Sequence, residues 1–306
     1  MSLMTRVKSR LRQRLRFEPL WLDTDAAPAR IAALPEAWMR AAAAELRADG
    51  LAVLRGHHAP AACVALAAAF KDYAARSPDA APYRDAHGLH ERLANFHLVS
   101  RHAQAFAEDD RIVRFLELLF EAEPAVVGSL YFEKGSTQSI HRDTPCFFTN
   151  PLNHFFGVWT ALEDVTADAG PLTYFKGGHT LVPDRGLLDA ETRSEDYFPA
   201  IVAACRAAGL VQTELLARQG DVVIWHPQLP HGGAPRRDET RSRASIVFHY
   251  KPVDAVIMGP TEFFSGSRTT PRHPQQPVVQ LGRLTAIDHG GPQFFHNRYE
   301  GNFDEF

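Results

Sequence analysis

The chain of 306 residues contains little cysteine and lacks any long apolar run. Its three cysteines, Cys63, Cys146 and Cys205, are too few for a disulfide framework, and no Cys-x-x-Cys pair suggests zinc binding or thiol redox chemistry. This usage favours a reducing compartment, so we expect a cytoplasmic protein. No segment approaches the roughly 20 apolar residues of a membrane-spanning helix, and we expect none to cross a bilayer.

Hydrophobic residues, in contrast, are plentiful. They make up 45% of the chain, which includes 20 Phe, so the chain can bury a sizeable core and wholesale disorder is excluded. The length fits two domains or one large β-rich or α/β domain. Because the sequence contains neither an internal repeat nor an obvious linker, we expect one elaborated domain.

The formal net charge of −3 conceals an uneven distribution. Residues 1–17 carry six basic side chains and no acidic one, which leaves 27 basic against 36 acidic residues in the rest of the chain. Apolar residues recur there at four-residue steps, which predicts a basic amphipathic helix. It fits a helix on the anionic inner face of a membrane, an organelle-targeting segment, or a solvated arm packed on the acidic body. We expect no nucleic-acid partner.

The pattern of the remaining chain changes from helical to β near residue 125. Helices are predicted over 35–49, from Pro60 onward and over 112–120. Short aromatic and β-branched segments follow, separated by Gly, Pro and Asp, and predict strands at 126–132, 155–162, 172–175, 222–225 and 245–250. This order predicts an α+β, mainly β fold in which a β-sandwich or barrel is backed by N-terminal helices.

We expect three parts in the chain. Residues 1–17 form the basic arm, and residues 35–252 form a single domain with a charged insert at 180–219, which contains a helix near 197–208. Residues 253–306 form a C-terminal extension packed on or near the domain.

One His-x-Asp motif suggests a metal site. His141 and Asp143 lie two positions apart, so in an extended chain both side chains project from one face. An imidazole and a carboxylate on one face supply two adjacent ligands for a divalent metal. The motif alone is weak, because a surface His beside an Asp in an ion pair gives the same pattern.

A second segment strengthens this interpretation. The predicted strand at 222–225 leads through a turn to His231, which precedes Gly232 and Gly233, where the backbone can approach a site closely. Two His and one carboxylate on one face of a metal form the facial triad of non-heme Fe(II) oxygenases. His226 is the rival for His231, but it lies nearer the strand and lacks a following Gly.

A third element is an arginine on the next predicted strand. Arg243 shares a strand face with Ser245, Val247 and His249. An arginine there could bind a carboxylate through two parallel hydrogen bonds.

Taken together, these motifs resemble the phytanoyl-CoA dioxygenase family of Fe(II)/2-oxoglutarate-dependent oxygenases. The resemblance covers about residues 45–252. It rests on the His-x-Asp and on the stretches at 49–56, 159–164, 170–172, 177–179, 220–221, 231–232 and 243–250. It implies a double-stranded β-helix (jelly-roll, cupin-like) core with flanking helices.

The resemblance also implies roles for individual residues. His141, Asp143 and His231 would hold Fe(II) as the catalytic centre, and Arg243 would bind the distal carboxylate of 2-oxoglutarate. Dioxygen is the other co-substrate, with succinate and carbon dioxide as products. Further 2-oxoglutarate contacts are expected from the side chains of Trp159, Tyr131, Ser129 and Lys134. For Trp159, an ordinary place in the core is nearly as good an interpretation.

The chain departs from the family pattern at three places. Arg142 stands where many relatives have Gln, and Gly233 stands where many have Ser, so one hydrogen bond to the co-substrate could be missing. Arg241 is a rival for Arg243. The carboxylate at Asp143 argues against a halogenase, which needs that ligand position open for halide.

The substrate is not fixed by these motifs. Arg142, Phe147 and Asn153 follow the first metal ligand closely and could contact the substrate. For Phe147, packing in the core is the better interpretation. The expected reaction is hydroxylation of an unactivated C–H bond in a small molecule, a lipid or a lipid-linked sugar. Two alternatives remain: a metal-binding β-sandwich without catalysis, and a membrane-surface adaptor with a vestigial site.

Overall fold

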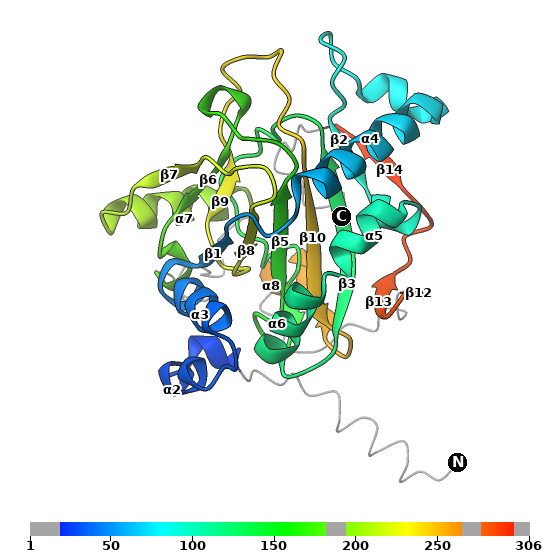
Figure 1. The fold of residues 1–306 in the computed structure, drawn as a ribbon. Coiled ribbons are helices and arrows are strands. Elements are labelled where there is room, and N and C mark those ends of the chain that lie inside the picture. The colour runs from blue at the N-terminus through cyan, green and yellow to red at the C-terminus, as the bar shows by residue number, and fades with distance from the viewer. Residues whose placement is uncertain (1–18, 182–193, 265–276, 297–306) are drawn as a thin grey trace.

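The computed structural model describes residues 19–181, 194–264 and 277–296. Its centre is a mixed sheet whose strands follow one another as β1-β8-β5-β10-β3-β13-β12, with β2 and β14 joined to it through β3 (Figure 1). The bounds of these strands are β1 Leu51–Leu54, β2 Arg92–Ala94, β3 Pro124–Phe132, β5 Phe156–Ala161, β8 Val222–Trp225, β10 Ser245–Pro252, β12 Val278–Leu281, β13 Leu284–Ile287 and β14 Gln293–Phe295.

A smaller sheet faces the central one. Its order is β7-β6-β9, and a two-stranded ladder pairs β11 with β4. Side chains from both sheets, among them Val223, Val247, Tyr174 and Leu215, form one buried cluster between the layers. We call this space the interior. The bounds are β4 Thr149–Asn150, β6 Leu172–Phe175, β7 Gln212–Leu215, β9 His231–Gly233 and β11 Val256–Ile257.

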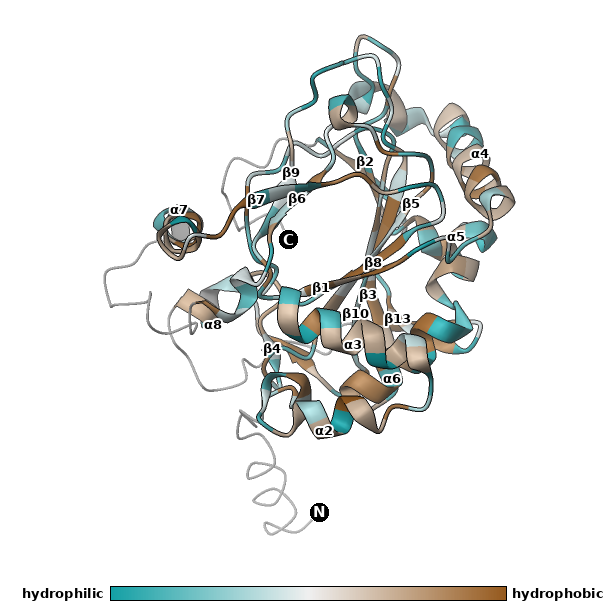
Figure 2. Cartoon of the chain, turned by 60° about the vertical axis from the view of Figure 1, so that its left-hand side comes forward, coloured by the Kyte–Doolittle hydropathy of each residue, from teal (hydrophilic) through white to brown (hydrophobic). Residues whose placement is uncertain are grey.

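Helices cover the other face of the central sheet, so the molecule has three layers (Figure 2). In α6, apolar residues at helical spacing are buried against the sheet, and Asp109 caps the first turn. The helix bounds are α2 Ala27–Ala32, α3 Ala37–Asp49, α4 Pro60–Arg76, α5 Arg101–Ala107, α6 Asp110–Phe120, α7 Ser194–Ala207 and α8 Pro260–Phe264, with 3-10 turns η1 Trp21–Asp23, η2 Pro78–Tyr83, η3 Phe96–Leu98, η4 Ala167–Ala169 and η5 Gly178–Thr180.

The alternation of β10 separates the layers. Ile246, Phe248 and Tyr250 pack into the cluster shared with the helices, whereas Val247 lies in the interior. Residues directly opposite each other in a ladder share a face, so Trp159 of β5, which pairs with Val247, also lies in the interior. The interior is therefore lined by alternate residues of β1, β3, β5, β8 and β10.

Most of the predicted elements are confirmed. The strands at 172–175 and 222–225 have the predicted bounds, and α3, α4 and α6 follow the predicted helices. The strands β2, β7 and β12 to β14, of three or four residues each, and the seven-residue helix α5 were not anticipated, because such short segments carry little periodicity. The basic arm at 1–17 lies outside the described residues. Among the described helices, none is long and apolar enough to span a membrane.

Candidate active site

His141, Asp143 and His231 converge at the edge of the interior. The Asp143 Oδ1 atom lies 3.8 Å from His141 Nε2 and 3.9 Å from His231 Nε2. All three ligand atoms lie within 4.8 Å of one another, and each residue is buried or half-buried. The two histidines and the carboxylate thus form the predicted triad.

Backbone pairing brings the two histidines together. His141 N donates to His231 O at 2.8 Å, and His231 N donates to His141 O at 2.9 Å. This approach needs glycine beside the second histidine, because a Cβ at Gly232 would lie 2.6 Å from Gln138 O. A Cβ at Gly233 would lie 2.6 Å from Ser136 Oγ, which explains why serine is absent from that position here.

Hydrogen bonds orient each ligand atom. The Nδ1 atoms of His141 and His231 lie 2.8 and 2.9 Å from the carbonyl oxygens of Ser139 and Leu229. A carbonyl only accepts, so Nδ1 must donate and the Nε2 lone pairs face the centre. Trp225 Nε1 donates to Asp143 Oδ2 at 2.8 Å and leaves Oδ1 for a metal.

The electrostatics suit a divalent cation. Burial, and then repulsion from His231, lowers the pKa of His141 to about 4. Burial would raise the pKa of Asp143, but His231, His249 and His141 and the Trp225 hydrogen bond hold that pKa below its ordinary value. At neutral pH, His141 is therefore neutral and Asp143 is ionised. This donor set fits Fe(II), which the two imidazoles and one carboxylate would hold with open positions opposite them.

Arg243 lies in the same interior, where no carboxylate among the described residues forms a hydrogen bond or ion pair with it, although the charge of Glu163 is near enough to act on its pKa. It is 4% exposed, donates to Ser245 Oγ at 3.1 Å, and has a buried Nε atom without a hydrogen-bond partner in the described structure. Its guanidinium lies 5.7 Å from the Trp159 ring and 5.8 Å from the Phe132 ring. Burial lowers its pKa to about 10, which still leaves it charged. The rival Arg241 is half exposed and pairs with Asp238.

The structure does not bring three of the predicted co-substrate contacts to this place. Tyr131 stacks on Phe70 in the helix-side cluster, with ring centroids 3.9 Å apart. Ser129 shares a 2.7 Å hydrogen bond with His97, which is buried on the same, helix-covered side of the sheet. Lys134 binds Asp85 at 3.0 Å and Glu91 at 3.6 Å. Because Ser129 and Tyr131 pair with outward residues of β10, we no longer assign them to 2-oxoglutarate.

The predicted substrate contacts have other surroundings. Arg142 is fully buried and donates to Gly178 O and to Gln228 Oε1. Phe147 stacks on Phe155, with ring centroids 4.4 Å apart. Asn153 donates to Asp23 and accepts from Gln228.

Two further residues near the triad were not singled out from the sequence. Phe198 of α7 lies edge-on to His141, with ring centroids 6.2 Å apart, so the insert contributes a wall. His249 packs against both Phe147 and Phe155 and acts on the charge of Asp143. Strand alternation places His249 on the same face as Arg243, which was the available signal.

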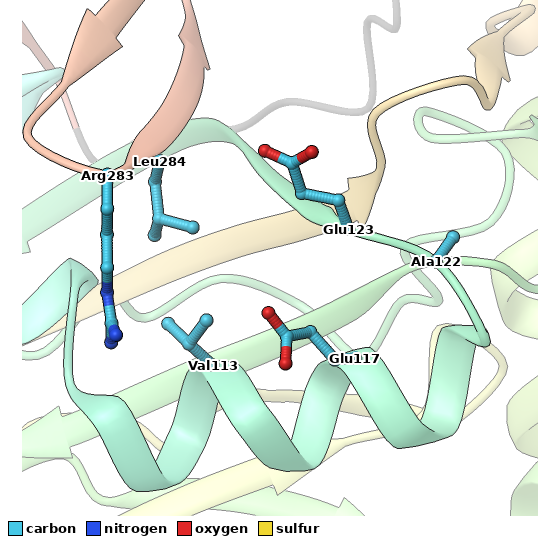
Figure 3. Close-up of a pocket in the computed structure, with 6 residues that line it drawn as sticks. All are labelled: Val113, Glu117, Ala122, Glu123, Arg283 and Leu284. Atoms are coloured by element: carbon cyan, nitrogen blue, oxygen red, sulfur yellow. The ribbon is translucent and has the colours of Figure 1, made fainter.

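A separate cavity lies away from this centre. It has a volume of about 430 Å³ and lies between α6 and the turn that joins β12 to β13 (Figure 3). Its lining includes Glu117, Glu123 and Arg283 and none of the triad residues. Arg283 is already bound to Glu108 and Asp110, so nothing there indicates a ligand.

Comparison with known proteins identifies relatives of this chain. The family model of phytanoyl-CoA dioxygenase (PhyH) matches residues 46–244. Phytanoyl-CoA dioxygenase domain-containing protein 1 of Mus musculus is 26% identical over 196 residues, which cover 63% of this chain. The protein of Rattus norvegicus is 25% identical over 192 residues. The matches span 64% and 63% of these relatives, just under two thirds of their length.

Solved structures show the same fold. The α-ketoglutarate-dependent carbocyclase SnoK from nogalamycin biosynthesis superposes with a TM-score of 0.60 at 18% identity, covering 82% of this chain and 96% of SnoK. The epimerase SnoN, solved with Fe³⁺, α-ketoglutarate and nogalamycin RO, gives 0.57 at 20% identity, covering 83% and 96%. The predicted jelly-roll fold with helices is thereby confirmed. With the family model matching well over half of its length, the chain belongs to the phytanoyl-CoA dioxygenase family of non-heme Fe/2-oxoglutarate oxygenases.

Proposed function

We propose that the protein is an Fe(II)- and 2-oxoglutarate-dependent dioxygenase that oxidises an unactivated C–H bond. His141, Asp143 and His231 would hold the iron, and Arg243 would bind the distal carboxylate of 2-oxoglutarate. When bound, iron and 2-oxoglutarate supply the oxidising chemistry, which consumes dioxygen and yields succinate and carbon dioxide. The observation that carries the proposal is a charged, buried arginine that no carboxylate of the described residues contacts by a hydrogen bond or ion pair, in the interior that the triad borders.

The chain's own groups prepare that interior for an anionic ligand. Within the described residues, Glu163 acts on the buried Arg243 guanidinium only through its charge, and a bound carboxylate would pair with the guanidinium directly. Trp159 and Phe132 enclose Arg243 and exclude water, so its hydrogen bonds to a ligand would be stronger than at a surface. A metal-binding β-sandwich without catalysis has no need of this arginine, so we place that alternative second.

The substrate class is proposed more broadly. A small molecule, a lipid or a lipid-linked sugar would enter beside α7, where Phe198 borders His141. SnoK and SnoN, whose fold this chain shares, are described as a carbocyclase and an epimerase, so the oxidation need not end in hydroxylation. If residues 1–17 bring the enzyme to a membrane-bound substrate, their deletion will reduce sedimentation with anionic liposomes. Equal sedimentation of both forms would remove this indication of a lipid.

The main test is an anaerobic titration of the protein with Fe(II) and then 2-oxoglutarate. We expect the visible metal-to-ligand band of a chelated 2-oxo acid, and release of succinate once dioxygen is admitted. Absence of both the band and succinate, with and without candidate substrates, would overturn the proposal. Turnover of 2-oxoglutarate against lipid, acyl, saccharide and amino-acid pools would then identify the substrate class.

A further inference from the structure

Asp23 connects the N-terminal turn η1 to the loops that carry the metal ligands. It precedes the segment 46–244 matched by the family model, so it belongs to a part of the chain outside that match. Its side chain is 25% exposed, yet it accepts hydrogen bonds from two residues more than a hundred positions away. A surface carboxylate with two such partners organises the loops that it joins.

The first branch runs inward through side-chain amides. Asn153 Nδ2 donates to Asp23 Oδ2 at 3.1 Å, and Gln228 Nε2 donates to Asn153 Oδ1 at 2.9 Å. Gln228 Oε1 then accepts from Arg142 Nη1 at 3.2 Å. Exposure decreases along the branch until Gln228 is 4% and Arg142 0% exposed.

The branch ends beside both metal-bearing segments. Arg142 is the residue between His141 and Asp143, and Gln228 precedes His231 by three positions. The Arg142 guanidinium also donates to Gly178 O at 2.9 Å, which fixes it against η5. A displacement of either residue therefore moves a ligand of the triad.

The second branch explains the rival histidine. His226 Nε2 lies 3.3 Å from Asp23, and His226 Nδ1 accepts from Gln228 N at 3.1 Å. Because Nδ1 accepts, Nε2 carries the proton and donates to the carboxylate. His226 is thus committed to Asp23 and holds the same turn as Gln228.

Asn153 has a backbone that suits its place. Its φ is +61°, in the left-handed region, where asparagine is tolerated better than most residues. Its amide both donates to Asp23 and accepts from Gln228, which an apolar side chain cannot do.

We propose that Asp23 and Asn153 are positioning residues that set the geometry of the iron site through Gln228 and Arg142. The inference rests on the proposed function of the triad, and it adds to that function a control from outside the family-matched segment. Partners of metal ligands affect metal affinity strongly, because they fix the direction of each donor atom. Backbone bonds such as Asp143 N to Pro227 O already hold the loops near each other, so the network sets their final orientation.

The test compares variants of the full-length protein by anaerobic Fe(II) titration and by the position of the 2-oxoglutarate band. Asn153→Gly keeps the left-handed backbone and removes only the amide. This substitution breaks both hydrogen bonds of the amide, and we expect Fe(II) affinity to fall about three- to tenfold and the band to shift. Asp23→Ala should act in the same direction, and Asp23→Asn, which retains an acceptor, should recover part of the loss. Asp25→Ala, an exposed neighbour, is the matched control and should bind as the wild type does.

Thermal unfolding of the apo-protein separates positioning from stability. If Asn153→Gly and Asp23→Ala lower the melting temperature but bind Fe(II) and 2-oxoglutarate as the wild type does, the network is structural only and the inference is wrong. If the wild-type protein itself shows no band, the proposed function fails instead. If the variants do not fold, Asp23→Asn alone decides by its affinity and band.

Discussion

Within the part of the chain that the structure describes, two places bring together two histidines and one aspartate, and one of the two has the character of a metal site. The triad at His141, Asp143 and His231 is one, and the group of His57, His58 and Asp109 is the other. In each group, the three potential ligand atoms lie within 4.8 Å of one another. They differ in what the donor atoms already bind.

In the triad, one ligand atom of each residue is directed to the centre. The Nδ1 atoms and Asp143 Oδ2 are engaged elsewhere, which leaves two Nε2 atoms and Oδ1. In the other group, Asp109 Oδ1 accepts from His57 Nε2 at 3.0 Å and from the backbone N–H groups of Arg111 and Ile112. It caps the positive end of α6, where an added cation is disfavoured. Proximity of histidine and aspartate side chains is therefore insufficient for a metal site. The hydrogen bonds that these side chains already make decide whether their ligand atoms are available to a cation.

The largest expected effect comes from removing the shared carboxylate of the triad. Asp143→Ala takes away one of three ligands and leaves two histidines, so Fe(II) binding should be lost at concentrations that saturate the wild type. Isothermal titration with Fe(II) under argon measures it. Asp109→Ala is the matched control, and a comparable loss of metal in that variant would reverse the contrast between the two groups.

The next effect concerns the co-substrate. Arg243→Ala should weaken 2-oxoglutarate binding by about 2–3 kcal/mol, since hydrogen bonds to a charged group are lost. Fe(II) affinity should hardly change, because Arg243 is no ligand. Titration of the visible band with 2-oxoglutarate gives the value, with the half-exposed Arg241→Ala as control. Should Arg241→Ala show the loss instead, the assignment moves to Arg241.

The sequence predicted the metal triad better than the co-substrate contacts. His141 and Asp143 lie two positions apart on one short segment, and Gly232 indicates a close backbone approach, so local patterns suffice. For Ser129 and Tyr131 the outcome depends on how β3 pairs with β10. A shift by one residue exchanges the two faces of a strand, and the register lies in long-range pairing that the local pattern does not encode.

The N-terminal contribution could not be read from the sequence for a related reason. Asp23 meets His226 across 203 positions and Asn153 across 130 positions. No periodicity connects a lone aspartate with an amide so far along the chain. The folded layers, which bring η1 beside the loops before β5 and after β8, create this contact.

An intermediate effect tests the partner of Asp143. The Trp225 indole packs against His231, with ring centroids 4.8 Å apart. Trp225→Phe keeps an aromatic ring at this place but removes the indole N–H that donates to Asp143 Oδ2. We expect Fe(II) affinity to fall by about tenfold, as for other partners of metal ligands. Gly157 allows this indole to lie over β5, since a Cβ there would come within 2.3 Å of it. Unchanged affinity in Trp225→Phe would mean that the backbone alone orients the carboxylate.

The smallest effect belongs to the group that we exclude as a metal site. Asp109→Ala removes the acceptor for two backbone N–H groups of α6 and for His57, and should lower the free energy of unfolding by about 1 kcal/mol. Asp109→Asn keeps a capping oxygen and should lose less. Urea unfolding followed by circular dichroism measures both, with and without Zn²⁺. Because the cap accounts for Asp109 without any ion, Zn²⁺ should not stabilise the wild type through this group, and a Zn²⁺-dependent gain that Asp109→Ala abolishes would show that the group does bind metal.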